Sequence, residues 1–277
     1  MNTINDILKS KIPKGKMQFI PRSFDLIGSI AVVEIKNEVK KYEKKIAEAI
    51  MQLHKPVRTV AKKASSMHGE FRVRKVKIIA GEHSTETIYR EHGVAMKLDV
   101  AKTYFSVRLS HERERISSLV KDKENVLVMF AGVGPFALVI AKKKPRANVV
   151  GIELNPTATK YFKENVKLNK LDNCIAIKGD VRKIIPKKFK NWADRVLMPL
   201  PKSAETFLDV AFKAAKKNAT VHFYNFGAEE DFEEIREKIA MAAKKSGANI
   251  KIMNEKIVRP YAPHIVQVCI DFRVRKN

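Results

Sequence analysis

The chain has 277 residues, 45% of them hydrophobic, which is enough for one large domain or two of ordinary size with a real core. Its 55 Lys and Arg residues against 30 Asp and Glu give a formal net charge of +25, which does not suit a protein with neutral partners. A polyanion is the natural partner, and nucleic acid is the commonest polyanion. A heat-adapted surface explains the charge less well, because heat-adapted chains usually raise Glu together with Lys.

The few potential metal ligands and thiols indicate no metal site and no disulfide. Cys174 and Cys269 both lie inside apolar runs, so we interpret them as core residues. His68, His83 and His111 do not have the spacing of metal ligands. The start of the chain has no signal-peptide core, and no apolar run approaches the ~20 residues of a membrane span. We therefore expect a soluble, cytoplasmic protein that does not enter a membrane.

Residues 1–107 predict a basic, RNA-contacting α+β domain of ordinary size. Hydrophobic periodicity predicts its elements in this order: a short amphipathic segment within 1–25, a strand at 29–35, a helix at 40–53, strands at 57–61 and 73–80, and a hairpin of 85–89 with 94–100. Residues 108–124 are expected to form a linker, with a helix at 110–119.

From residue 125 to 277 strands and helices alternate regularly. The expected strands are 126–129, 148–154, 174–178, 194–198, 219–226, 249–258 and 266–274. The expected helices are 135–144, 155–169, 203–217 and 229–245, and 182–190 is expected to be a basic loop. This alternation predicts an α/β domain with a mostly parallel, doubly wound sheet, and the last two strands predict an antiparallel edge.

The first strand of this domain ends in a glycine turn. Gly132 and Gly134 let the backbone pass close to a ligand and adopt positive φ without a Cβ penalty. A helical pattern begins at once with Pro135. Because ligands of doubly wound sheets bind at the carboxyl ends of the strands, this turn is expected to approach a ligand.

Two acids follow the next two strands. Glu153 can accept hydrogen bonds from both hydroxyls of a ribose, and Asp180 can accept one from an adenine amino group. Each acid alone could simply cap a helix, but helix capping does not explain the whole set. The turn and the acids together predict an adenosine-containing ligand.

A nicotinamide dinucleotide fits this pattern less well than S-adenosylmethionine. The Gly-x-Gly-x-x-Gly fingerprint is incomplete, and Pro135 and Phe136 stand where a pyrophosphate would want backbone donors. The last strand pair is also foreign to the six-strand dinucleotide order. S-adenosylmethionine carries no phosphate, and Phe130 and Phe136 could pack on its adenine or sulfonium.

Nine short stretches carry a family resemblance. In chain order they are 68–74 (HGEFRVR), 98–106 (LDVAKTYFS), 108–113 (RLSHER), 129–136 (MFAGVGPF), 153–156 (ELNP), 165–169 (NVKLN), 179–182 (GDVR), 200–202 (LPK) and 261–263 (YAP). Together they resemble the archaeal and eukaryotic tRNA (guanine-37-N1)-methyltransferases and their relatives in wyosine synthesis. The resemblance implies a Rossmann-like class I methyltransferase domain, S-adenosylmethionine as donor, and the purine 3′ of the tRNA anticodon as target.

The resemblance also implies roles in methylating guanine N1, which needs a base for its proton and stabilisation of the charge that builds on O6. The family's proton acceptor falls on Glu112, and an arginine near the base falls on Arg72. A guanidinium suits O6 because it is always charged and offers forked donors. Tyr104 and Arg108 would line the pocket. Without the resemblance, Glu112 would be interpreted as one half of a solvated helix pair and Arg72 as a phosphate contact.

The implied donor contacts include Arg113, which would approach the methionine carboxylate. The other contacts implied by the resemblance are Phe130, Glu153, Leu154, Asp180 and Val181, next to the turn of Gly132 and Gly134.

Three departures from the family pattern stand out. Val128 replaces an acid just before the glycine turn, and Pro199 replaces an asparagine after the fourth strand. Proline offers only its carbonyl, so the edge of a plain guanine should be recognised less strictly. This pattern fits the archaeal branch that also, or instead, methylates the tricyclic wyosine intermediate imG2 at carbon. The domain with which family members often check the tRNA elbow is not expected in this chain.

The leading hypothesis is a monomeric tRNA methyltransferase acting at N1 of guanosine 37 in the anticodon loop. The basic surface of residues 36–77 and 182–190 would hold phosphates. The alternatives are methylation of the tricyclic intermediate, aminocarboxypropyl transfer on the same scaffold, and a non-catalytic RNA-binding module. The 200–202 motif argues against the aminocarboxypropyl transferase, and a nicotinamide dehydrogenase is the weakest alternative.

Overall fold

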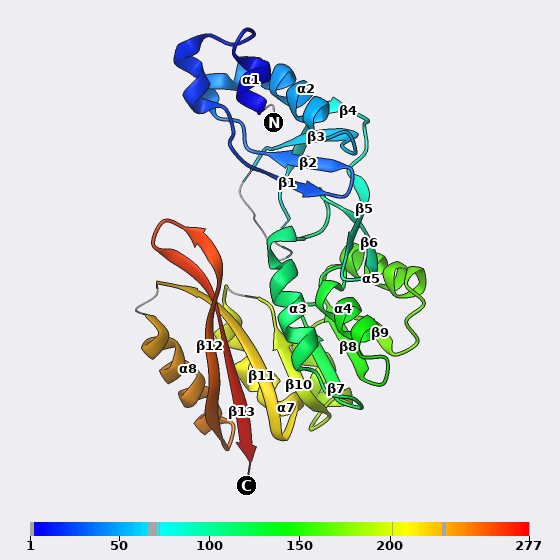
Figure 1. Ribbon diagram of the computed structural model, residues 1–277. Helices are drawn as coiled ribbons and strands as arrows, with labels where there is room; N and C mark the ends of the chain where they lie inside the picture. Colours follow the sequence, from blue (N-terminus) through cyan, green and yellow to red (C-terminus); the bar gives the residue numbers. More distant parts are fainter. Residues whose placement is uncertain (1–2, 66–70, 72, 201, 229–230, 277) are drawn as a thin grey trace. The chain divides into compact units, whose positions relative to one another are not determined.

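The computed structural model describes residues 3–65, 71, 73–200, 202–228 and 231–276 (Figure 1). The chain divides into two compact units, one of Met1–Glu91 with Ala95–Val107 and the other of His92–Val94 with Arg108–Asn277. Within the described ranges no helix is both long and apolar enough to cross a bilayer.

The first unit is built on a four-stranded sheet in the order β1-β2-β3-β4. β2 and β3 are parallel, and the two outer pairs are antiparallel. The strands are β1 (Phe24–Ile27), β2 (Ile30–Val33), β3 (Thr59–Lys63) and β4 (Val76–Gly81). β1 was not expected from the sequence; it reaches β2 through a tight turn in which Gly28 has a φ of 57°.

Helix α2 (Glu43–Leu53) covers this sheet with the apolar face that its periodicity predicts. Ile46, Ala49 and Ile50 are buried at helical spacing. The short helix α1 (Ile4–Leu8) and the 3-10 turns η1 (Lys14–Phe19) and η2 (Asn37–Tyr42) pack around it. The expected hairpin is β5 (Glu86–Glu91) with β6 (Val94–Asp99), and His92 and Gly93 both have the positive φ that a tight hairpin turn favours.

The second unit contains a seven-stranded sheet in the order β12-β13-β11-β10-β7-β8-β9. Its strands are β7 (Asn125–Met129), β8 (Asn148–Glu153), β9 (Cys174–Lys178), β10 (Ala193–Met198), β11 (Ala215–Gly227), β12 (Ala248–Ala262) and β13 (Ile265–Lys276). β7 to β11 pair in parallel, whereas β13 is antiparallel to both β11 and β12. The predicted doubly wound sheet with an antiparallel edge is confirmed, and its switch point lies between β7 and β10.

Helices pack on this sheet in two groups. The first contains α3 (Ser110–Leu119), α4 (Pro135–Lys143) and α5 (Pro156–Leu168), and the second contains α6 (Val181–Lys188), α7 (Leu208–Ala214) and α8 (Phe232–Lys245). Figure 1 shows α3 in front of the sheet and α7 behind it. Strands covered on both faces are apolar throughout, and Val126 to Met129 are accordingly all buried.

Three boundaries differ from the sequence-based expectation. Residues 182–190 were expected to be a loop, but α6 spans most of them. Pro186 and the lysines favour a loop by sequence, whereas the Asp180 side chain caps a helix that begins at Val181. The helix expected at 203–217 is a 3-10 turn, η4 (Ala204–Phe207), followed by α7, and β11 already begins at Ala215. β12 runs on to Ala262, so the stretch expected to connect the last strands is mostly strand.

Candidate functional site

The carboxyl ends of β7, β8 and β9 bring the glycine turn and both acids to one edge of the sheet. Ala131 N donates to Ile152 O at 2.9 Å, and Gly179 N donates to Glu153 O at 2.9 Å. These backbone bonds join the loops that follow the three strands. We call this the donor edge: Phe130, Gly132, Gly134, Glu153, Leu154, Asp180 and Val181.

The turn of the donor edge requires glycine for reasons of space as well as conformation. Gly134 has a φ of 91°, and a Cβ there would lie 2.2 Å from Cδ2 of the Phe162 ring in α5. A Cβ on Gly151 would lie 2.4 Å from Cε1 of the same ring. Asn165 of α5 also donates from Nδ2 to Val133 O at 3.1 Å. Phe162 thus packs against the turn and Asn165 hydrogen-bonds to it, and the sequence alone did not reveal either role.

Glu153 is held by backbone donors. Its Oε2 accepts from Gly132 N at 2.7 Å, and its Oε1 accepts from Asn155 N at 2.7 Å. Burial raises the pKa of Glu153, and the bonds from Asn155 and Gly132 partly oppose this. Each carboxylate oxygen can accept a second hydrogen bond, so the group fits the two hydroxyls of a ribose.

Asp180 and its neighbours complete the edge. Its Oδ1 accepts from Arg182 N at 2.8 Å, so this acid does cap a helix, as the simpler interpretation holds. Leu154 is 38% exposed, which leaves an apolar surface beside Glu153, whereas the Val181 side chain is buried in the core. Phe130 packs edge-on against Phe207, with ring centroids 4.8 Å apart. The edge therefore combines an acid, an exposed apolar side chain and an aromatic ring, which suits an adenosine moiety.

The expected catalytic residues lie in different places. Arg72 is outside the described residues. Tyr104 is half-buried in the first unit, just after β6. Pro199 follows β10 at the centre of a tight turn closed by Leu200 N donating to Met198 O at 2.8 Å. Val128 is wholly buried between β8 and β10, where an apolar side chain fits the core.

Glu112 is not the solvated helix residue that its charged neighbours suggest. Only 3% of it is exposed. Arg115 binds the carboxylate with both arms of its fork, Nε to Oε2 at 2.8 Å and Nη2 to Oε1 at 2.7 Å. The Tyr224 hydroxyl of β11 donates to Oε1 at 2.7 Å. Arg113 on the same helix is also buried.

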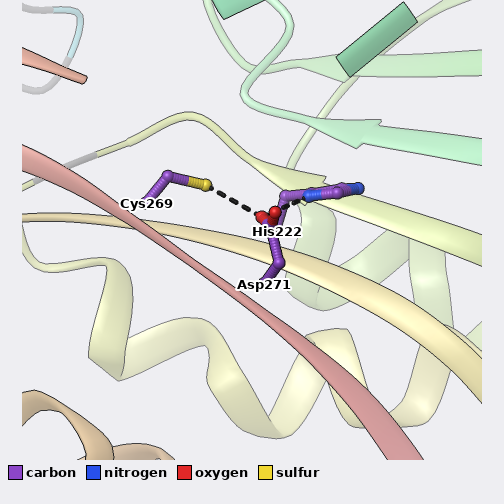
Figure 2. A group of neighbouring side chains, drawn as sticks. All are labelled: His222, Cys269 and Asp271. Carbon is purple, nitrogen blue, oxygen red and sulfur yellow. Dashed lines mark hydrogen bonds and ion pairs between the residues drawn. The ribbon is translucent and has the colours of Figure 1, made fainter. Parts of the chain in front are cut away.

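A chain of hydrogen-bonded polar groups continues from Arg115 to β13. Arg115 Nη1 donates to Asp271 Oδ2 at 2.7 Å, and Asp271 Oδ1 accepts from His222 Nδ1 at 2.6 Å and from Cys269 Sγ at 3.2 Å. Figure 2 shows His222 and Cys269 both directed at the Asp271 carboxylate. On its far side, His222 Nε2 lies 2.7 Å from Arg195 Nη1, and Arg195 pairs with Glu124. We call this network the ion chain. Its members are Glu112, Arg115, Asp271, Cys269, His222, Arg195 and Glu124.

The geometry of His222, Cys269 and Asp271 resembles a metal site, since their ligand atoms lie within 4.8 Å of one another. However, the guanidinium groups of Arg115 and Arg195 bind directly to this trio. Two adjacent cations oppose a third, and the Asp271 oxygens are already used by donors. The trio is therefore a hydrogen-bonded network. The sequence alone indicates only a core position for Cys269 and no role for His222 or Asp271, because the partners of these residues are distant in the chain.

A surface cavity of about 700 Å³ lies elsewhere. Its lining includes Asn191, Lys213 and Lys276, which lie at the amino ends of the parallel strands β10 and β11. Because ligands of doubly wound sheets bind at the carboxyl ends, this cavity is not the donor site.

Known proteins match both parts of the chain. A model of the TRM5/TYW2 methyltransferase domain matches residues 87–252, and a model of the TYW2 N-terminal domain matches residues 4–85. The chain is 44% identical over 264 residues to the tRNA (guanine(37)-N(1))-methyltransferase Trm5b of Pyrococcus abyssi, covering 95% of this chain and 78% of that protein. It is 32% identical over 275 residues to the tRNA(Phe) (4-demethylwyosine(37)-C(7)) aminocarboxypropyltransferase of Pyrococcus horikoshii, covering 99% and 97%.

A solved structure extends the match to three dimensions. The complex of aTrm5 and tRNALeu has a TM-score of 0.86 at 34% identity, covering 100% of this chain and 78% of that one. The domain model alone matches more than half of the chain. The resemblance that the sequence indicated is thereby confirmed, and the chain belongs to the TRM5/TYW2 methyltransferase family.

Proposed function

We propose that this protein transfers the methyl group of S-adenosylmethionine to N1 of guanosine 37 in tRNA. The observation that carries the proposal is the 44% identity to a tRNA (guanine(37)-N(1))-methyltransferase across 95% of the chain. The donor edge and the net charge of +25 agree with an adenosine-containing donor and a polyanionic substrate.

The donor edge holds the donor. Glu153 accepts from the ribose hydroxyls, and its backbone donors keep both oxygens in place for them. Leu154 and Phe130 pack on the adenine, and Asp180 accepts from its amino group. Arg113 pairs with the methionine carboxylate. When bound, S-adenosylmethionine supplies an electrophilic methyl group on a sulfonium.

Glu112 accepts the N1 proton of guanine. Its Oε1 already receives two donors, whereas Oε2 receives only the Arg115 Nε–H among donors on described residues. A lone pair of Oε2 is therefore available for the proton. Arg72 stabilises the charge on O6, and Tyr104 lines the base pocket. RNA loops allow a single base to be splayed out for such a reaction.

Glu112→Gln tests the assignment of the base. The single-turnover rate should fall about 100-fold or more, because general-base catalysis commonly contributes that much, while tRNA and donor binding persist. Glu114→Gln is a matched control: this acid lies on the same helix but pairs with Lys143 and is 41% exposed. Unchanged turnover of the Glu112 variant would overturn the assignment.

Pro199 relaxes the choice of base in this proposal. Its tight turn presents a carbonyl and no side-chain donor, so a tricyclic wyosine intermediate can be accepted beside guanine. Pro199→Asn should raise the preference for guanosine by roughly 2- to 10-fold, the value of one hydrogen bond. Competition between the two tRNAs measures this ratio, and an unchanged ratio would rule Pro199 out as a determinant.

The decisive experiment is mass spectrometry of nucleosides after reaction with two tRNAs, one with guanosine and one with the tricyclic base at position 37. We expect 1-methylguanosine from the first, with a tRNA that has adenosine at position 37 as control. We further propose that the enzyme is cytoplasmic and acts as a monomer. Sedimentation at increasing protein concentration tests the oligomeric state.

Aminocarboxypropyl transfer is the second candidate, favoured by the match to the Pyrococcus horikoshii enzyme over almost the full length of both chains. Two donors, one labelled in the methyl group and one in the aminocarboxypropyl group, separate the candidates. Label in tRNA from the second donor alone would replace the first proposal. Absence of donor binding in calorimetry would instead indicate a non-catalytic RNA-binding module.

A further inference from the structure

The ion chain joins the proposed base to two strands at the far end of the sequence. Arg115 lies between two carboxylates: its Nε and Nη2 bind Glu112, and its Nη1 binds Asp271 at 2.7 Å. Burial alone would lower the pKa of Arg115, but its hydrogen bonds to Glu112 and Asp271 raise it above its usual range. This guanidinium is therefore a permanent cation that the two acids share.

Asp271 is itself fixed from the other side. His222 Nε2 faces Arg195 Nη1, and arginine has no acceptor, so Nε2 must carry the lone pair and Nδ1 the proton. The ring is neutral and donates from Nδ1 to Asp271, in agreement with a pKa of His222 that burial lowers. Burial alone would raise the pKa of Asp271, but the bonds from His222 and Arg115 hold it well below its usual range. Asp271 thus keeps a full negative charge facing Arg115.

The acids of the ion chain outnumber its guanidiniums. Glu112, Asp271 and Glu124 face the two guanidiniums of Arg115 and Arg195, so the hydrogen-bonded groups carry one unbalanced negative charge. Without the charge of Asp271, Arg115 would belong to Glu112 alone and would make that carboxylate a poorer proton acceptor.

We propose that Asp271 is a positioning residue of the methyl transfer: by sharing Arg115, it holds the Glu112 carboxylate in place and keeps it basic. This inference rests on the proposed role of Glu112. Tyr224 acts in the opposite sense, because its hydroxyl donates to the Glu112 carboxylate and stabilises the ionised form.

Several charged or polar groups face Glu112, and the buried Arg113 is its neighbour on the same helix. Among described residues the facing groups are Arg115 from its own helix, Tyr224 from β11 and, across Arg115, Cys269 and Asp271 from β13. Helix α4 also packs on α3, but its Lys143 pairs with Glu114. The two substitutions with opposite expected effects are therefore Asp271→Asn and Tyr224→Phe.

The test is the single-turnover methyl-transfer rate of the full chain on guanosine-37 tRNA across pH 5 to 9. In the plot of rate against pH, Asp271→Asn should lower the plateau rate about 10-fold. It should also move the acid limb, where the rate falls as pH is lowered, to lower pH, with KM for tRNA and donor nearly unchanged. Tyr224→Phe should move the acid limb to higher pH. Asp194→Asn is the control, because this acid of the same sheet pairs with Lys216 outside the ion chain, and its profile should match the wild type.

A structural role alone would not move the two limbs in opposite directions. Limbs that stay in place, or move together, in variants with wild-type near-UV circular dichroism would overturn the role of Asp271 while Glu112→Gln remains inactive. An active Glu112→Gln variant would instead remove the base assignment and this inference with it. If Asp271→Asn does not fold, Asp271→Glu decides, because it keeps the charge but displaces the carboxylate that binds Arg115: a lowered plateau rate with the acid limb of the pH–rate profile near its wild-type position supports the proposal, and a wild-type plateau overturns it.

Discussion

The donor edge and the ion chain belong to the same seven-stranded sheet but hold their acids in different ways. At the donor edge, Glu153 is held by two backbone N–H groups, from Gly132 and Asn155. In the ion chain, Glu112 and Asp271 are held by a shared guanidinium, Arg115. Backbone donors are neutral and fixed by the strand ends, whereas a guanidinium brings a charge that links one acid to another. The first arrangement suits binding of a neutral diol, and the second suits control of a proton.

The largest expected effect tests the backbone scaffold of the donor edge. Gly134→Ala places a Cβ 2.2 Å from the Phe162 ring at a φ of 91°, so we expect a loss of about 3 to 4 kcal/mol in unfolding free energy and of donor binding. Gly247→Ala separates the two causes, because its φ is 66° with no atom within 4 Å. It should cost only about 1 kcal/mol in the same urea titrations. Equal losses would show that the contact with Phe162 is unimportant.

The next effect tests the side-chain scaffold through pH. The folded-state pKa of Asp271 lies below its unfolded value, so its stabilisation is present above about pH 4 and is lost as pH falls from there toward the folded-state value. Asp271→Asn should cost about 2 kcal/mol at neutral pH and less in acid. Unfolding midpoints measured between pH 7 and pH 3 give this difference. A constant gap between variant and wild type would contradict the linkage. Asp194→Asn serves as the control, because this half-buried acid pairs with Lys216 outside the ion chain.

A smaller effect tests whether Glu153 binds the donor as well as the turn. Glutamine offers one carbonyl oxygen to two backbone donors, so Glu153→Gln should weaken S-adenosylmethionine binding about 10-fold. Because burial raises the pKa of Glu153, wild-type affinity should also fall in mildly acidic solution as the carboxylate takes up a proton. Calorimetric titrations at several pH values measure both. A pH-independent affinity would show that the ribose hydroxyls of the donor bind a group other than Glu153.

The smallest effect lies outside both regions, on the exposed face of α6. Lys183→Ala and Lys187→Ala should each reduce the slope of log affinity for tRNA against log salt by about 1, with the transfer rate at saturation unchanged. Lys251→Ala on β12 is the control. An unaltered slope in the α6 variants would indicate that the phosphate contacts lie in the first unit instead.

The donor edge was accessible to sequence reasoning because its signals are local. Gly132 and Gly134 stand directly after an apolar strand, and Glu153 and Asp180 end the next two strands, so alternation alone places them at one edge. Residues that support this edge without such a signal, such as Phe162, were missed. Helix α6 was missed because Pro186 and its lysines indicate a loop, whereas the Asp180 cap and burial of Ile185 stabilise a helix.

The sequence by itself determined the alternation of strands and helices, the antiparallel tail, the family and the residues of the glycine turn. Each of these depends on neighbours along the chain, through periodicity, turn chemistry or short motifs. Only the tertiary structure decided that Glu112 is buried and bound to Arg115, and that Asp271, 156 positions away from Arg115, shares that guanidinium. The physical reason is that charge pairing acts through space, and the sheet order brings α3, β11 and β13 together in a way that no local pattern records.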